Sequence, residues 1–90
     1  MKTIRNKRIP NHLRKYRRAR GLNQRDTARI LGFADGSRIS RWERGLCLPT
    51  AINLFRLAAV YHVLADALYI DVLRGIRAIR VRAEWPFHKR

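Results

Sequence analysis

The part of the chain that most constrains the fold is residues 22–45, which read LNQRDTARILGFADGSRISRWERG. The first half has the pattern of a short helix, in which Asn23 is a favourable N-cap and Ala28 and Leu31 form an apolar stripe with i, i+3 spacing. Gly32 provides a favourable end, because glycine adopts the left-handed backbone conformation at little cost. We therefore predict a short helix between Asn23 and Gly32.

A second short helix is predicted after a turn. Asp35 or Ser37 can provide its N-cap, and Gly45 closes it. Ile39 and Trp42 share one face, which we expect to be buried. The arginines that share another face are Arg38 and Arg41. Two short helices joined by a tight turn, with arginines presented by the second, have the geometry that places a helix in the major groove of DNA.

The stretch resembles the helix-turn-helix of the Cro and phage-repressor type, the XRE-like regulators. The matching residues are Leu22, Gln24, Ala28, Leu31, Gly32, Ile39, Ser40, Arg41, Glu43, Arg44 and Gly45, with Gly21 before them and Pro49 after them. The resemblance covers about residues 13–68 and implies an all-α, five-helix, lambda-repressor-like domain at 11–69. Six residues separate Gly32 from Ile39, one more than in the commonest version, so two neighbouring positions stay open for the start of the recognition helix.

Side chains near the N-terminus of the recognition helix contact base edges in this family. The candidates for base contacts are Ser37, Arg38 and Arg41, with Ser40 behind them. Arg41 is the strongest, because it matches the family position that points into the groove; a phosphate contact is its alternative. Arginine can donate two hydrogen bonds to O6 and N7 of guanine, so we expect a guanine in each half-site.

Four further residues are candidates for phosphate contacts: Asn23, Gln24, Arg44 and Arg18. Gln24 lies at a helix N-terminus, where backbone N–H groups and the helix dipole favour an anion. The alternative for Asn23 and Gln24 is that both only cap the helix. Arg44 follows from the family's docking mode, and Arg18 lies on the outer side of a helix expected at about residues 11–20.

Arg17 and Glu43 are expected to form a structural ion pair. In the resembling family, the arginine at position 17 pairs with the glutamate near the end of the recognition helix. A carboxylate at a helix C-terminus also faces the negative end of the helix dipole, which disfavours it unless a cation compensates. The alternative is an unpaired surface glutamate.

The charge of the chain indicates a polyanionic partner. Lys and Arg number 21 against 6 Asp and Glu, which gives a formal net charge of +15. Double-stranded DNA is the leading partner. A membrane is disfavoured, because no apolar run approaches the ~20 residues of a span, and residues 1–10 lack the apolar core of a secretory signal. We expect a cytoplasmic, nucleoid-associated protein, encoded by a bacterium or a phage.

Cofactor and enzyme chemistry find no support in the pattern. Cys47 is the only cysteine, which excludes an intrachain disulfide and cysteine-rich zinc sites. The histidines are scattered, and no paired carboxylates or nucleophile with a nearby base are evident. We therefore expect no metal, no cofactor and no catalytic residue.

The regions around the motif divide the chain further. Residues 1–10 are predicted to form a basic arm, with a solvated, disordered terminus as the alternative. A fourth helix is predicted at about 51–61, capped by Thr50. Its expected apolar face consists of Leu54, Phe55, Ala58 and Tyr61. A short fifth helix is predicted at 65–69.

The C-terminal extension at 70–90 is open between two structures. Val72, Leu73, Ile76 and Ile79 have helical spacing, whereas residues 79–83 alternate as a strand would; we favour the helix. The apolar stripe at 70–83 is a candidate dimer seam or site for a protein partner. Its alternative is packing against its own domain.

Three functions compete at this point. The leading one is a sequence-specific, homodimeric DNA-binding transcriptional regulator that reads a near-palindromic operator. The second is a basic RNA-binding or ribosome-associated protein, because charge alone carries no sequence specificity. The third is an antitoxin-type module that binds both DNA and a protein. The capping and turn pattern favours DNA, since the major groove of A-form RNA is too narrow for a helix.

Overall fold

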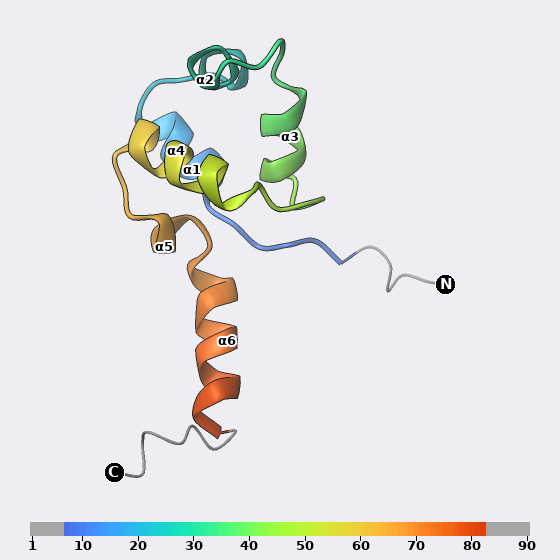
Figure 1. Ribbon diagram of the computed structural model, residues 1–90, viewed down its shortest axis with the longest axis vertical. Helices are drawn as coiled ribbons and strands as arrows, with labels where there is room; N and C mark the ends of the chain where they lie inside the picture. The colour runs from blue at the N-terminus through green and yellow to red at the C-terminus, as the bar shows by residue number, and fades with distance from the viewer. Residues whose placement is uncertain (1–6, 83–90) are drawn as a thin grey trace.

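The computed structural model describes residues 7–82, and every regular element in that range is a helix (Figure 1). The helices are α1 (Leu13–Ala19), α2 (Gln24–Leu31), α3 (Ser37–Glu43), α4 (Ala51–Tyr61), α5 (Ala65–Leu68) and α6 (Ile70–Arg82). The predicted all-α fold is confirmed. Figure 1 shows α1 to α4 gathered into a bundle, with α5 beside it and α6 extending away from it.

The ends of α2 follow from side chains close in sequence. The Asn23 side chain accepts a hydrogen bond from the Asp26 N–H at 2.7 Å, and the Asp26 carboxylate accepts one from the Asn23 N–H at 3.0 Å. This reciprocal pair is a capping box. At the other end Gly32 is left-handed (φ 84°), and the Phe33 N–H donates to the carbonyl of Ala28 at 2.8 Å. Both ends therefore lie where the local sequence predicts them.

The start of α3 differs from the expected cap. The N-cap residue is Gly36, neither Asp35 nor Ser37, and the helix begins at Ser37. The Asp35 carboxylate accepts hydrogen bonds from the N–H of Ser37 at 3.0 Å and from its hydroxyl at 2.7 Å. A Cβ at position 36 would lie 3.3 Å from the Cβ of Gln24. Close packing against α2 thus favours glycine at the cap position.

The core lies between the first five helices. Its buried apolar residues are Leu13, Ala28, Leu31, Ile39, Trp42, Leu57, Ala58, Tyr61, Leu68 and Tyr69. The prediction that Phe55 belongs to the buried face of α4 is wrong, because this side chain is 60% exposed. Phe55 and Leu57 lie on opposite flanks of the helical stripe, and only the flank with Leu57 faces the bundle.

The two ends of α4 are held differently. The Thr50 hydroxyl accepts a hydrogen bond from the N–H of Asn53 at 3.3 Å, as the predicted cap requires. His62 ends the helix in the left-handed conformation (φ 59°), at a position where the resembling family has glycine. Without glycine this conformation costs about 1–2 kcal/mol. From the middle of α4, Arg56 Nη2 donates to the carbonyl of Leu31 at 2.6 Å and so satisfies the end of α2.

The described part of the C-terminal extension forms α6 (Ile70–Arg82), the structure favoured over the strand. Its first turn packs on the core through Val72, and the Asp71 carboxylate lies 3.1 Å from His12 Nε2. Further along, Ile76 and Ile79 are 51% and 60% exposed. Among the side chains described up to residue 79, the stripe therefore packs against its own domain at its beginning and is exposed at Ile76 and Ile79. Across residues 7–82, none of the helices has the length and apolar character needed to cross a bilayer.

The end of the predicted basic arm is docked onto the bundle. The N–H of Ile9 donates to the carbonyl of Gly45 at 2.9 Å, and Ile9 packs against the core. The Asn11 amide donates to the carbonyls of Ile9, Trp42 and Glu43 at 3.1–3.3 Å. The described end of the predicted basic arm is thus held at Arg8 and Ile9 by backbone carbonyls that follow α3. Residues 1–6 and the tail 83–90 lie outside the described residues.

Candidate nucleic-acid interface

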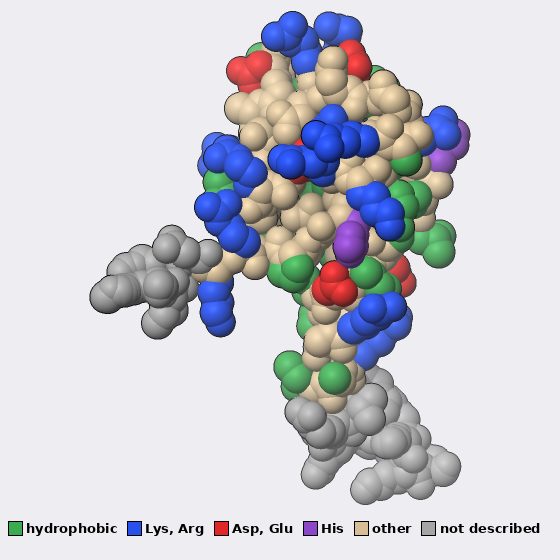
Figure 2. Space-filling view, turned by 180° about the vertical axis from the view of Figure 1, so that it is seen from behind, with side chains coloured by type: hydrophobic (Ala, Val, Ile, Leu, Met, Phe, Trp, Pro, Cys, Tyr) green, Lys and Arg blue, Asp and Glu red, His purple; other side chains and the backbone are tan. Residues whose placement is uncertain are grey.

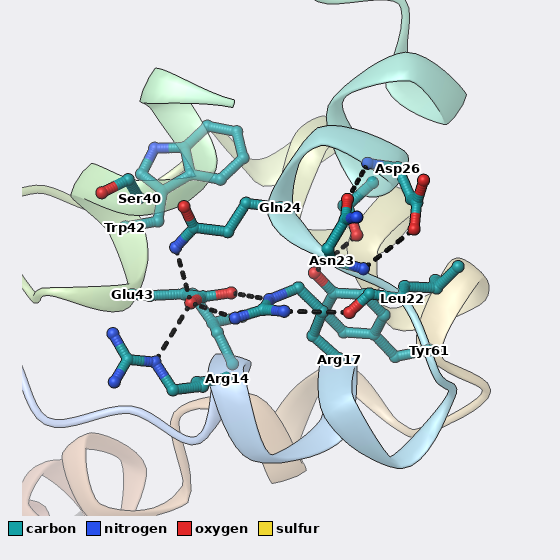
Figure 3. Close-up of polar contacts among 12 residues, drawn as sticks. Arg14, Arg17, Leu22, Asn23, Gln24, Asp26, Ser40, Trp42, Glu43 and Tyr61 are labelled. Carbon is teal, nitrogen blue, oxygen red and sulfur yellow. Dashed lines mark hydrogen bonds and ion pairs between the residues drawn. The ribbon is translucent and has the colours of Figure 1, made fainter. Parts of the chain in front are cut away.

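A buried carboxylate lies at the end of α3. The side chain of Glu43 is fully inaccessible, and that of Arg17 is 8% exposed. Arg17 Nε donates to Glu43 Oε2 at 2.6 Å, and Arg17 Nη2 donates to Oε1 at 3.0 Å, so that the structure brings the two expected partners together (Figure 3). The third nitrogen of the guanidinium, Nη1, donates to the carbonyl of Leu22 at 2.9 Å. Arg17 therefore links α1 to both α3 and the start of the helix-turn-helix.

Two further donors reach the same carboxylate. Gln24 Nε2 donates to Glu43 Oε1 at 3.0 Å, and Arg14 Nε lies 3.4 Å from the same oxygen (Figure 3). The Gln24 side chain thus neither caps α2 nor points freely outward; it connects the first residue of α2 with the last residue of α3. This role of Gln24 was not predicted, because no local signal in the sequence links positions 24 and 43.

The charges in this cluster stabilise each other. Burial is the largest single effect on Glu43 and opposes its ionisation. The hydrogen bonds from Arg17, Gln24 and Arg14 and the charge of Arg17 together outweigh it, so the pKa of Glu43 lies below its ordinary value. The hydrogen bond to Glu43 raises the pKa of Arg17 against the opposing effect of burial. Both groups are therefore charged at neutral pH, and the cation offsets the unfavourable helix dipole at Glu43.

The base-contact candidates lie on the outer side of α3. Ser37, Arg38 and Arg41 are exposed, and Ser40 is half-buried behind them. Arg38 and Arg41 border the same open hollow between α3 and the start of α4. The Ser37 hydroxyl already donates to Asp35. The two arginines are consequently the long, exposed donors of this helix.

Phe33 is a residue of this surface that sequence analysis missed. The guanidinium carbon of Arg38 lies over the Phe33 ring, 4.5 Å from its centroid. The same ring meets Trp42 edge to face, with centroids 5.9 Å apart and an interplanar angle of 71°. The signal was an aromatic residue directly after the helix-ending Gly32, in a turn one residue longer than usual.

The phosphate-contact candidates occupy different environments. The Asn23 side chain is engaged in the capping box, and that of Gln24 in the Glu43 cluster. Arg44 is exposed just after α3, where its carbonyl accepts a hydrogen bond from Arg8 Nη1 at 3.0 Å. Arg18 is exposed on α1. Figure 2 shows Lys and Arg side chains spread over one face of the bundle with few carboxylates among them, which makes this face attractive to a polyanion.

Comparison with known proteins gives one match. A family described as helix-turn-helix matches residues 13–68, which is more than half of the chain. The matched region runs from the first residue of α1 to the last residue of α5 and leaves α6 outside. No curated protein matches the chain, and no solved structure matches it either. Among residues 7–82, no group of three or more metal-ligating side chains is present.

Proposed function

The chain belongs to the Cro/C1-type (XRE-like) helix-turn-helix family of DNA-binding transcription regulators, and from this we infer that α3 reads a specific operator in the major groove. The observation that supports this proposal is the pair Arg38 and Arg41, exposed on one side of a helix whose last residue is held by the buried Glu43 cluster. A fixed helix with exposed donors on its outer side can bring them to base edges in one register.

We assign the contacts as follows. Arg41 and Arg38 contact base edges, and at least one of them contacts guanine. Ser37 and Ser40, which have shorter side chains, also contact base edges. Backbone N–H groups at the start of α2, near Asn23 and Gln24, bind a phosphate with the help of the helix dipole. Arg44 and Arg18 contact phosphates on either side of the groove.

We also propose a homodimer formed through α6. The helix lies outside the matched domain, and Ile76 and Ile79 stay exposed on it at helical spacing. Two copies joined through this stripe would cover both side chains, and their recognition helices would read half-sites one helical turn apart, about 34–36 Å. The operator is then a near-palindrome.

The test is selection of duplexes from a randomised pool by the full chain at near-physiological salt, with unrelated duplex and RNA as competitors. We expect enrichment of a near-palindromic site with a guanine in each half. Equal binding to every competitor would reduce the function to charge-driven binding, and preference for RNA would favour an RNA-binding protein instead.

A matched pair of variants separates sequence reading from charge. Replacing both Arg38 and Arg41 by Ala should cost about 1–3 kcal/mol per lost base contact and flatten the preference at those base pairs. The control replaces Arg25 and Arg29, which are exposed on α2, by Ala and so removes the same charge. This control should keep the sequence preference. An unchanged preference in the folded Arg38/Arg41 variant would refute the assignment.

A further inference from the structure

We propose that Phe33 is a specificity-determining residue, which positions the Arg38 guanidinium for its base contact. This inference rests on the proposed function, in which Arg38 reads a base. The observation that carries it is the guanidinium carbon of Arg38 over the Phe33 ring, 4.5 Å from the centroid, at an exposed position of α3.

The Phe33 ring is itself fixed from two sides. Gly32 ends α2 in the left-handed conformation, and the hydrogen bond from Phe33 N–H to Ala28 sets the direction in which the chain leaves the helix. On the other side the ring packs edge to face on Trp42, which is 5% exposed and belongs to the core. A rigid platform thus stands beside the second residue of the recognition helix.

A guanidinium that lies with its face on such a platform keeps its donors free. The N–H groups of a guanidinium lie in its own plane, so a ring against its face does not compete with hydrogen bonds at its edge. A long arginine side chain otherwise loses much rotamer freedom when it forms an ordered contact. The Phe33 ring restrains the side chain before DNA binds, and less freedom is then lost at the base.

The test compares the base preferences of variants selected on the same duplex pool. Arg38→Ala should flatten the preference at one base pair of each half-site. Phe33→Leu should lower the preference at the same base pair by about two- to fivefold. This range corresponds to the energy of a cation–π contact at an exposed site. Phe33→Tyr keeps the ring and should restore the preference. The double variant Phe33→Leu/Arg38→Ala should lose no more than Arg38→Ala alone, because the ring acts through the arginine.

The outcomes separate this inference from the proposed function. Unchanged preference in Phe33→Leu, next to a flattened one in Arg38→Ala, would overturn the positioning role and leave the base contact in place. An unchanged preference in Arg38→Ala would rule out the base contact of Arg38, and with it the positioning role of Phe33. Phe55→Leu removes an exposed ring elsewhere, on α4, and should change nothing.

A second measurement does not depend on whether Phe33→Leu folds, since Phe33 also contacts Trp42. In the NMR spectrum of the unmodified chain, the Hδ protons of Arg38 should be shifted upfield by the ring current of Phe33. The Hδ protons of Arg41 serve as the internal reference. Equal Hδ shifts in the two arginines would show that the stack is absent in solution and would overturn the inference.

Discussion

The N–H of Ile9 donates a hydrogen bond to the carbonyl of Gly45 at 2.9 Å, which ties the segment before α1 to the residue that follows the recognition helix and its cap. Gly45 is left-handed (φ 74°), and a Cβ there would lie 2.5 Å from the carbonyl oxygen of Ile9. Position 45 therefore excludes a side chain for two reasons, the backbone conformation and the space that Ile9 occupies.

This contact predicts a difference between two glycines. Gly45→Ala should destabilise the fold by about 1–2 kcal/mol for the left-handed backbone, and by a further amount for the displacement of Ile9. Gly21 is the matched control, because it is also left-handed (φ 73°) but a Cβ added to it would meet no atom within 4 Å. Urea unfolding should show a larger loss for Gly45→Ala than for Gly21→Ala. Equal losses would mean that Ile9 does not dock in solution.

The Arg17–Glu43 pair predicts strong coupling. Removing either partner leaves a buried charge uncompensated, which costs about 3–5 kcal/mol. Arg17→Gln and Glu43→Gln should each lower the free energy of unfolding, and the double variant should lose clearly less than the sum of the two. The measurement is a double-mutant cycle by urea unfolding. Additive losses would contradict the pair.

The lowered pKa of Glu43 predicts the pH dependence of stability. A carboxyl whose pKa is lower in the folded than in the unfolded chain stabilises the fold above the unfolded pKa, about 4.3. This contribution disappears as the pH falls through the folded pKa. The stability gap between the wild-type chain and Glu43→Gln should therefore be full at pH 7 and shrink below about pH 4. A gap that stays constant to low pH would contradict the shift.

Salt dependence should distinguish phosphate contacts from base contacts. For each phosphate contact removed, the slope of log Kobs against log salt should fall by about 0.9. Arg18→Ala and Arg44→Ala should weaken binding to all duplexes alike and reduce this slope. Arg41→Ala should change the preference at one base pair. Binding isotherms at several salt concentrations test this, and a loss of selectivity in Arg18→Ala would contradict its assignment.

The proposed dimer predicts a concentration-dependent change of mass. Replacing Ile76 and Ile79 by Asp should shift the chain to monomers in sedimentation experiments, because two charges would enter the apolar stripe. DNA affinity for a two-half-site operator should fall much more than affinity for a single half-site. Leu64→Asp is the control, since Leu64 is 79% exposed on another part of the surface. A wild-type chain that stays monomeric on its operator would rule out the dimer.

The elements predicted best from the sequence are those with signals close to their ends. α2 begins after Asn23 and ends at Gly32, and α4 begins after Thr50, because a cap acts on residues three or four positions away. The prediction of Asp35 or Ser37 as the N-cap of α3 was wrong. The N-cap is Gly36, which packs closely against Gln24 on another helix, and such a contact leaves no local signal.

Long-range contacts in the site could not be predicted from the pattern alone. The Arg17–Glu43 pair was expected through the family resemblance and the helix dipole, but nothing local shows that Gln24 binds the same carboxylate. The prediction that Phe55 is buried was wrong for a related reason. Helical spacing defines an apolar stripe but does not say which of its flanks a neighbouring helix covers.

One carboxylate, that of Glu43, collects donors from two other helices, Arg14 and Arg17 on α1 and Gln24 on α2. The side chains at positions 37, 38 and 41 take no part in its described hydrogen bonds and face outward. The residue that orients α3 is thus different from the residues that α3 presents to its surroundings. If α3 reads an operator as proposed, substitutions at these outward positions would change the base preference without disturbing the contacts that orient the helix.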